Sequence, residues 1–337
     1  MPIDNPMSDP STNPNAQALA ALTGDAIFDL QHLALIGVDG DDAVDFLQGQ
    51  LTNELREVTD THAQQSAWCS PKGRVLTCFL VFRHRGRLLL QLPAALIEQT
   101  VKRMGMYVLR AKATLVDASD ELMRMGLVGE AAEECLRNTV GALPEHADDV
   151  LGTDRLTIIR LRGRRPRYEI VGPRAALAAL WEACGKVAVA ADADAWELLD
   201  IVAGVASIGP DTSDAFVPQM INLDRIGGIS FTKGCYVGQE IVARTQHLGR
   251  IKRRMYRAHW NGSAHLNPGE TLHGAGEANS PKARIVNAKA MPEGGFALLA
   301  VIPIDVATEL RDTGLTIADG SQLKLEALPY ALEDENA

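Results

Sequence analysis

The sequence predicts an α+β protein that ends in a small β-barrel. Apolar runs of strand length alternate with amphipathic helical segments from Phe28 to about residue 206. From Arg250 onward only short β patterns remain, and Gly- and Pro-rich turns separate them, as in small barrels. The chain has 337 residues, 46% of them apolar, which is enough for two or three domains with cores that need no disulfide or metal.

Residues 1–22 predict a disordered tail. Prolines recur there among Asn, Ser and Asp, and such a stretch buries too little apolar surface to order itself. Residues 23–120 predict a first α+β subdomain. Its expected strands are 33–38, 67–69, 74–82 and 88–92, and its expected helices are 41–55 and 94–106.

Residues 121–190 predict a second, ferredoxin-like α+β subdomain. We expect a strand at 125–128, a helix at 130–139, a hairpin of 156–161 with 168–171, and a helix at 173–184. Five arginines lie on this hairpin, and we interpret them as a solvated turn in preference to an RNA contact; they are Arg160, Arg162, Arg164, Arg165 and Arg167. Residues 191–249 predict a return segment with a helix at 195–206, a loop at 207–224 and a glycine-rich motif, and residues 250–337 predict the barrel.

The charge pattern restricts the compartment and the partners. Lys and Arg total 33 and Asp and Glu total 43, so the net charge of −10 argues against a module that only binds RNA. No Lys or Arg precedes Arg56, so we expect neither a secretory signal nor a transit peptide. No window approaches 18 continuous apolar residues, so we expect no membrane span and a cytoplasmic protein.

The cysteines and histidines predict no stable metal site. The five cysteines are Cys69, Cys78, Cys135, Cys184 and Cys235, without a CxxC pair, and the eight histidines form no HxxxH pattern. This spacing matches neither a disulfide framework nor a zinc or iron–sulfur cage, and it fits a reducing compartment.

One segment combines glycines with a candidate reactive thiol. It runs Lys233-Gly-Cys-Tyr-Val-Gly-Gln-Glu240, and a helix is expected to begin after Gly238. Cys235 therefore precedes a helix N-terminus and stands two residues from Lys233, and both features favour a thiolate. Local sequence leaves open the alternative that Cys235 is a buried residue of a tight turn.

This segment resembles the signature of the YgfZ family of folate-binding proteins, which are relatives of the glycine-cleavage T-protein. The resemblance covers residues 24–335 and extends to three further stretches, which are Leu47-Gln-Gly-Gln-Leu-Thr52, Phe216-Val-Pro-Gln-Met-Ile-Asn-Leu223 and Leu328-Pro-Tyr330. It implies a three-domain ring around a central channel that binds a tetrahydrofolate-type ligand. It also implies a role in maintaining iron–sulfur enzymes, including one that thiomethylates tRNA, with Cys235 as the critical residue.

The resemblance also places candidate site residues. Two family tryptophans associated with folate correspond to Trp196 and Leu33, and an aliphatic side chain at the second position removes a stacking face. We assign five further positions to the folate site, which are Asn222, Tyr236, Gln239, Glu240 and Arg244. Cys235 and Lys233 are the candidate reactive pair. Arg244 begins a cluster at 244–257 that could hold an anion, whereas His247 is expected to be a surface residue.

Three positions depart from the T-protein. Its Asp pair corresponds to Thr77 and Cys78, and its pterin-holding Glu corresponds to Val202. These side chains supply no carboxylate, so we do not expect conventional aminomethyl transfer. The sequence therefore predicts a folate-binding accessory protein for iron–sulfur enzymes or assembly factors that acts indirectly on tRNA. A folate-dependent one-carbon transferase is the alternative, and direct tRNA contact stays open.

Overall fold

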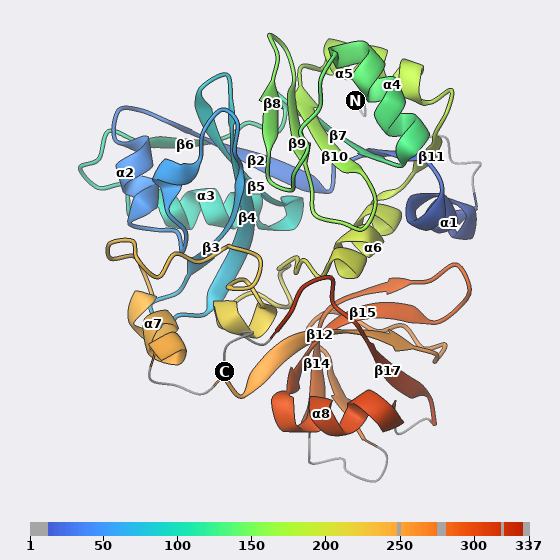
Figure 1. Cartoon of the computed structure of the whole chain (residues 1–337). Helices are drawn as coiled ribbons and strands as arrows, with labels where there is room; N and C mark the ends of the chain where they lie inside the picture. Colours follow the sequence, from blue (N-terminus) through green and yellow to red (C-terminus); the bar gives the residue numbers. More distant parts are fainter. Residues whose placement is uncertain (1–12, 248–250, 275–280, 318–319, 333–337) are drawn as a thin grey trace.

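The computed structural model describes residues 13–247, 251–274, 281–317 and 320–332. These residues form three β-sheets with helices packed on them. The sheets make three lobes, and helix α6 (Ala193–Ala203) lies between the second sheet and the C-terminal sheet (Figure 1). The predicted α+β ring is confirmed.

The first sheet is antiparallel, with strand order β3-β4-β5-β2-β6. Its strands are β2 (Leu33–Asp39), β3 (Gln64–Cys69), β4 (Val75–His84), β5 (Arg87–Pro93) and β6 (Thr114–Asp117). The helical pieces η2 (Ala94–Leu96) and α3 (Ile97–Gly105) follow β5, as expected for residues 94–106. Arg85 and Gly86 both have positive φ, which is the backbone that a two-residue hairpin between β4 and β5 requires.

The helix expected at 41–55 is shorter than the pattern predicts. It comprises α2 (Ala43–Gln48), and a separate 3-10 turn, η1 (Leu55–Glu57), follows after a break. In the break, the Thr52 hydroxyl donates to the Gly228 carbonyl, and the Asn53 side-chain amide donates to the Gly227 carbonyl. Side chains that bond to distant backbone compete with a helix, and this competition ends α2 early.

The second sheet has the order β11-β1-β7-β10-β9-β8. Its strands are β1 (Ala26–Asp29), β7 (Met123–Val128), β8 (Val150–Gly152), β9 (Thr157–Arg160), β10 (Arg167–Gly172) and β11 (Val189–Ala191). Strand β1 lies between β7 and β11, so residues 26–29 belong to this sheet and not to the subdomain predicted for 23–120. Strand β1 has only four residues, and hydrogen bonds to a neighbouring strand on each side hold it in the sheet. The spacing of residues in the sequence does not reveal these neighbours.

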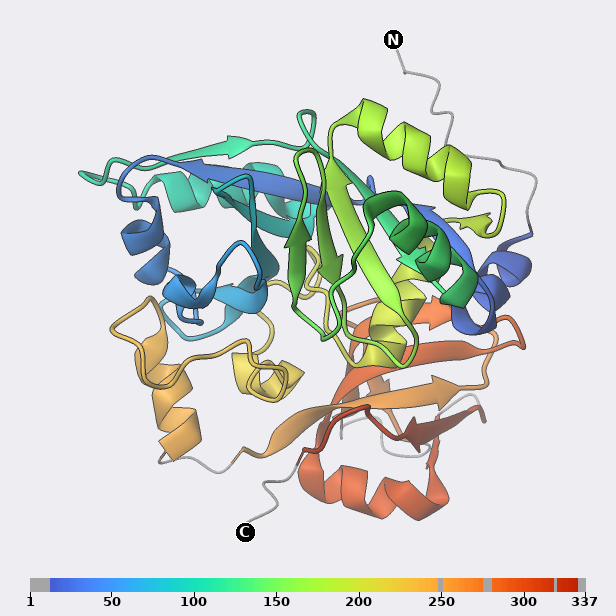
Figure 2. The same ribbon diagram turned by 45° about the horizontal axis from the view of Figure 1, so that its top comes forward.

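Two helices cover the outer face of the second sheet (Figure 2). They are α4 (Glu130–Val140) and α5 (Arg174–Cys184), and their apolar faces join Tyr168 and Ile170 of β10 in one core. Pro173 caps α5 from outside and does not occupy its first turn. The opposite face of β10 turns Arg167 and Glu169 toward the centre of the molecule.

The N-terminal segment corrects the prediction of a disordered tail. Residues 14–22 belong to helix α1 (Pro14–Thr23), whereas residues 1–12 lie outside the described residues. Asn13 caps the helix, and Pro14 occupies the first turn, where its missing N–H costs nothing. Ala18 and Ala21 are buried, and Oε1 of the Gln17 side chain accepts a hydrogen bond from the Asp192 N–H. Alanines allow this close approach, although they add little apolar surface.

The C-terminal lobe is a curled six-stranded sheet of order β13-β14-β15-β12-β17-β16. Its elements are β12 (Arg253–Trp260), β13 (Thr271–His273), β14 (Pro281–Ala290), β15 (Phe296–Pro303), α8 (Ile304–Thr313), β16 (Leu315–Thr316) and β17 (Gln322–Glu326). A single bridge between Gly274 and Ile317 joins its two edges. The small barrel is confirmed, and its predicted turn at 274–276 extends outside the described residues.

Helix α6 and the segment after it connect the lobes. The Asp192 carboxylate caps α6 at the Ala195 N–H. Gly204, in the left-handed conformation, follows the last helical residue, so the helix ends three residues before the predicted end. The Tyr330 hydroxyl donates to the Gly204 carbonyl and ties the C-terminal lobe to this point. The loop predicted for 207–224 contains one short turn, η3 (Pro218–Ile221).

Gly126 of β7 gives α6 its close approach to the second sheet. A Cβ added there would lie 2.4 Å from Cζ3 of Trp196. We expect Gly126→Ala to lower the free energy of unfolding by about 1–3 kcal/mol, because the methyl group overpacks a rigid indole. Gly152→Ala is the control, since a Cβ at Gly152 meets no atom within 4 Å. Equal urea midpoints for the two variants would contradict this packing.

Candidate functional site: a charged cavity and an exposed thiol loop

A cavity opens where the two α+β sheets, α6 and the segment after α6 meet. The side chains that line it come from β2, β4, β5, the β9–β10 hairpin and α6, and they include Leu33, Cys78, Gln91, Arg162, Arg167, Glu169, Trp196 and Asp200. Trp196 and Leu33, two residues predicted to bind folate, therefore lie in the same cavity. The charged residues among them were not predicted as site residues.

Glu169 is the most deeply buried charged group of the cavity. Its side chain is 0% exposed, and Oε2 accepts a hydrogen bond from Nε2 of Gln91 at 2.9 Å. Burial raises the pKa of Glu169 to about 7, although Arg124 and Arg167 act in the opposite direction. Among the described residues, no donor reaches Oε1 of Glu169 or Oε1 of Gln91. The cavity thus holds two buried acceptors without a partner.

Arg167 joins the second sheet to α6. Its Nη1 lies 2.7 Å from Oδ1 of Asp200, and its guanidinium lies 3.8 Å from the centre of the Trp196 ring. Trp196 is 1% exposed and packs on Phe28 with ring centroids 5.0 Å apart. Trp196 therefore supports Arg167 through a cation–π contact and does not offer this face to a ligand.

Four of the five hairpin arginines correct the interpretation of a solvated turn, and the fifth, Arg164, is exposed as expected. Arg167 is buried, and Arg162 forms an ion pair with Asp148 in the cavity wall. Arg160 lies over the Tyr168 ring, and Arg165 donates to the Gly24 carbonyl. The signal that sequence reasoning missed is the spacing of Arg167 and Glu169, because residues two apart on a strand share one face.

The positions that depart from the T-protein have distinct surroundings. Cys78 lines the cavity, and burial raises the pKa of its thiol to about 12, so the thiol is neutral near pH 7. Thr77 is buried and is not among the cavity-lining residues. Val202 also lies outside the lining, and its carbonyl accepts from Arg257 at 3.3 Å. The carboxylates that line this cavity come instead from Asp148, Glu169 and Asp200.

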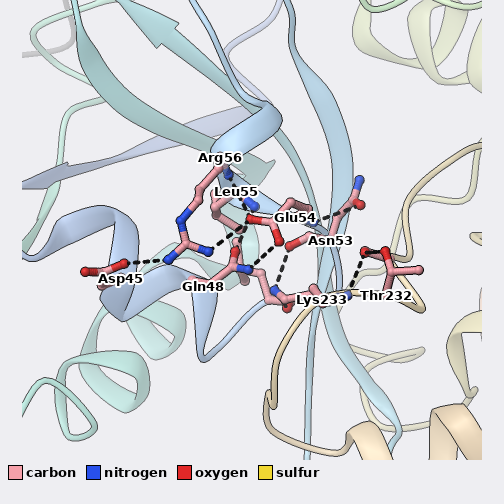
Figure 3. Close-up of polar contacts among 10 residues, drawn as sticks. Asp45, Gln48, Asn53, Glu54, Leu55, Arg56, Thr232 and Lys233 are labelled. Atoms are coloured by element: carbon pink, nitrogen blue, oxygen red, sulfur yellow. Dashed lines mark hydrogen bonds and ion pairs between the residues drawn. The ribbon is translucent and has the colours of Figure 1, made fainter.

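The thiol loop, residues 230–238, is held by its lysine. Lys233 is buried, and its ammonium donates to the carbonyls of Leu51 at 2.8 Å and Asn53 at 2.7 Å (Figure 3). Burial lowers the pKa of Lys233 to about 8, and Glu54 opposes this shift. The ammonium therefore bonds to the backbone of residues 51 and 53, and its predicted effect on the Cys235 sulfur stays a prediction.

Glycines allow the thiol loop to pack on the first sheet. Gly238 has φ +81°, and a Cβ there would lie 2.6 Å from the Ser70 carbonyl oxygen. Gly73 has φ +66°, and a Cβ there would lie 2.7 Å from Cβ of Ile241. Both positions require glycine for conformation and for space. Helix α7 (Gln239–His247) begins directly after this contact, as predicted.

The remaining predicted residues divide between the surface and the core. Cys235, Glu240 and Arg244 are exposed, and Tyr236 is buried. Gln239 donates to the Gly234 carbonyl at 3.3 Å. None of these five belongs to the described lining of the cavity. The alternative of a buried Cys235 is contradicted.

Asn222 and two arginines of the predicted anion cluster bond to other groups of the protein. Asn222, with φ +58°, donates to the Met255 carbonyl at 2.8 Å and is fully buried. Arg254 makes a two-pronged ion pair with Asp224, and Arg257 pairs with Glu326 at 3.0 Å. These arginines hold β12 in place, which leaves Arg244, Lys252 and Arg253 as exposed cations of the cluster. Arg250 lies outside the described residues, and so does the side chain of His247.

A solved structure shares the fold of this chain. The chain is similar to the glycine cleavage system aminomethyltransferase T from Bartonella henselae, with 16% identity and a TM-score of 0.74 over 97% of this chain and 91% of that one. Residues 10–160 match the GCVT N-terminal domain family. The fold is that of the glycine-cleavage T-protein.

Curated relatives define the family more narrowly. Three of them bear the name tRNA-modifying protein YgfZ. The relative from Colwellia psychrerythraea is 35% identical over 73% of this chain and 75% of its own length. That from Klebsiella pneumoniae is 30% identical over 96% and 98%, and that from Edwardsiella ictaluri is 32% identical over 89% and 91%. The chain belongs to the YgfZ family.

The described part of the chain has neither a metal-binding cluster nor a membrane-spanning helix. Its residues contain no group of three or more His, Cys, Asp or Glu side chains placed to hold a metal ion. In the same residues, no helix combines the length and the apolar character needed to cross a membrane.

Replacing Lys233 tests its role in the thiol loop. We expect Lys233→Met to lower the free energy of unfolding by about 1.5–3 kcal/mol, because two carbonyls lose a charged donor. The variant should also speed amide exchange in residues 49–53 and 230–236. Lys72→Met, on the exposed turn beside the loop, is the control and should be neutral.

The same variant tests how the free energy of unfolding depends on pH. The pKa of Lys233 falls from 10.5 to about 8 on folding, so between these values the unfolded chain holds a proton that the folded protein has released. Stability contributed by this group therefore rises with pH across that interval. The wild type minus Lys233→Met difference should show this slope, and a flat difference would argue against a buried ammonium.

Proposed function

We propose that this protein binds a reduced folate in the central cavity and supports tRNA thiomethylation by maintaining an iron–sulfur enzyme, with Cys235 as its reactive group. The relatives named tRNA-modifying protein support the tRNA part. The T-protein fold and the buried acceptors of the cavity support the folate part.

The observation that carries the folate proposal is the unpartnered pair of acceptors. The pterin ring presents an amino group and a ring N–H along one edge, and both are donors. Oε1 of Glu169 and Oε1 of Gln91 are buried acceptors on two side chains that are hydrogen-bonded to each other, so they fit such an edge. Arg162, in the same lining, is a donor suited to a folate carboxylate. A bound tetrahydrofolate would supply amine nitrogens that carry one-carbon groups.

Cys235 serves a partner outside the cavity. Its side chain is exposed, and the loop that presents it is fixed to the first sheet by Lys233, Gly238 and the Val237 N–H, which donates to the Gly49 carbonyl. An accessible thiol on a rigid loop can react with a macromolecule too large to enter a cavity. Iron–sulfur enzymes or their assembly factors are the proposed partners.

A folate-dependent one-carbon transferase remains a second candidate because of Glu169. A carboxyl group with a pKa of about 7 in a ligand cavity is suited to proton transfer near neutral pH. Cys78 and Thr77 argue against the T-protein reaction itself, since neither supplies the missing carboxylates. Release of ammonia and methylenetetrahydrofolate from an aminomethyl carrier at T-protein rates would favour this candidate.

Glu169→Gln tests the folate site. The amide replaces one acceptor by a donor at nearly the same volume, so we expect tetrahydrofolate binding, measured by calorimetry, to weaken by about 10- to 100-fold, or roughly 1.4–2.8 kcal/mol. Glu240→Gln is the control, because Glu240 is exposed on α7 and lies outside the cavity lining. Equal loss in both variants, or loss only in Glu240→Gln, would move the folate site to the thiol loop.

Cys235→Ala tests the thiol in cells that lack the native protein. At equal abundance, the variant should fail to restore thiomethylated tRNA, because the reactive sulfur is gone while the fold is kept. Thr232→Ala, an exposed change in the same loop, should restore it. Mass spectrometry of digested tRNA measures the modified nucleoside. Full restoration by Cys235→Ala would show that the sulfur is dispensable.

A further inference from the structure

The outer helices of the second sheet bring two cysteines into contact. Cys135 lies on α4, and Cys184 is the last residue of α5. Their Sγ atoms are 3.1 Å apart, with the Cys184 thiol donating to the Cys135 sulfur. Of the five cysteines, all of which lie in the described residues, this is the pair with a sulfur–sulfur contact. It is separate from the cavity and from the thiol loop.

The surroundings give the two sulfurs different roles. Cys184 is buried in the core of the lobe, and burial together with the adjacent Cys135 raises the pKa of its thiol. Cys135 is half-buried at the edge of that core, where a small oxidant can reach it first. A thiol at the surface with a second thiol behind it is the arrangement in which a sulfenic acid is captured as a disulfide.

The backbone of both cysteines is hydrogen-bonded to its neighbours in the chain. The Cys135 carbonyl accepts from the Thr139 hydroxyl at 2.9 Å, and the Cys184 carbonyl accepts from the N–H groups of Val187 and Ala188 at 3.0 Å each. The sulfurs therefore need to approach by only about 1 Å to reach the length of a disulfide bond.

We propose that Cys135 and Cys184 form a reversible intramolecular disulfide that links α4 to α5 when the protein meets a hydroperoxide. The Cys135 thiolate attacks a peroxide oxygen, the O–O bond breaks, and water leaves after protonation, which leaves Cys135 as a sulfenic acid. The Cys184 sulfur attacks that sulfur and loses its proton, the S–O bond breaks, and a second water leaves. Two thiols are oxidised to one disulfide, and one hydrogen peroxide is reduced to two waters.

The link would act on the sheet that forms one wall of the cavity. Helix α4 follows β7, and α5 follows β10, the strand of Arg167 and Glu169. A bond between the helices joins the ends of these two strand–helix units across a loop of about 50 residues. Closing so long a loop restricts the unfolded chain, so the oxidised protein should be the more stable form.

The experiment treats the full-length protein with hydrogen peroxide and compares it with Cys135→Ser and Cys184→Ser. We expect the thiols of Cys135 and Cys184 to be lost in addition to that of the exposed Cys235, their peptides to be joined in a non-reducing digest, and the melting temperature to rise by several degrees. Dithiothreitol should reverse all three changes. Neither variant should show the joined peptides or the rise.

Cys69 and Cys78 provide the internal control. They lie on the paired strands β3 and β4, and both are buried, yet they should stay reduced. Cys135→Ser alters a half-buried side chain, so it keeps the test decisive even if Cys184→Ser fails to fold. The proposal fails if Cys135 and Cys184 are still alkylated separately after peroxide has oxidised Cys235. It also fails if either of them is found joined to any other cysteine.

Discussion

The buried guanidinium of Arg167 is the interaction on which the arrangement of the lobes depends. Arg167 extends from β10, lies over the Trp196 ring and pairs with Asp200. Because both partners belong to α6, this one side chain connects the second sheet to that helix. Helix α6 in turn packs against β14 and β15 of the C-terminal lobe. A buried cation is stable only with such partners, and removing one of them leaves an uncompensated charge. The cavity wall is therefore also the joint between lobes.

A second buried cation performs a similar task for the thiol loop. Lys233 has no carboxylate within hydrogen-bond distance among its described contacts, and two backbone carbonyls receive its ammonium. Glu54 lies near enough to favour the charged form, and Arg56 acts against it. Backbone oxygens cannot move away as a flexible side chain can, so the loop has one position relative to β3. Cys235 is presented to solvent from this fixed base.

The cavity and the exposed thiol have different chemical environments, and this difference supports two separate tasks. Oε1 of Glu169 and Oε1 of Gln91 are buried in the cavity lining, and unpaired acceptors favour a ligand with donors along one edge. Cys235 lies at the surface, beyond the lining of that space. A ligand in the cavity contacts the side chains between the lobes, including Arg167 and Asp200. Ligand binding can thus stabilise the ring without touching the thiol.

The sequence by itself determined the α+β class, most strands of the first two sheets, the start of α7 and the family motif. These features follow from local periodicity and from glycines whose backbone no other residue adopts easily. Only the tertiary structure decided that β1 joins the second sheet, that alanines order α1, and that Lys233 bonds to residues 51 and 53. It also decided that Arg167 and Glu169 face a cavity. Each of these depends on contacts between residues far apart in the chain, and the energy of a buried charge is set by partners that local sequence does not name.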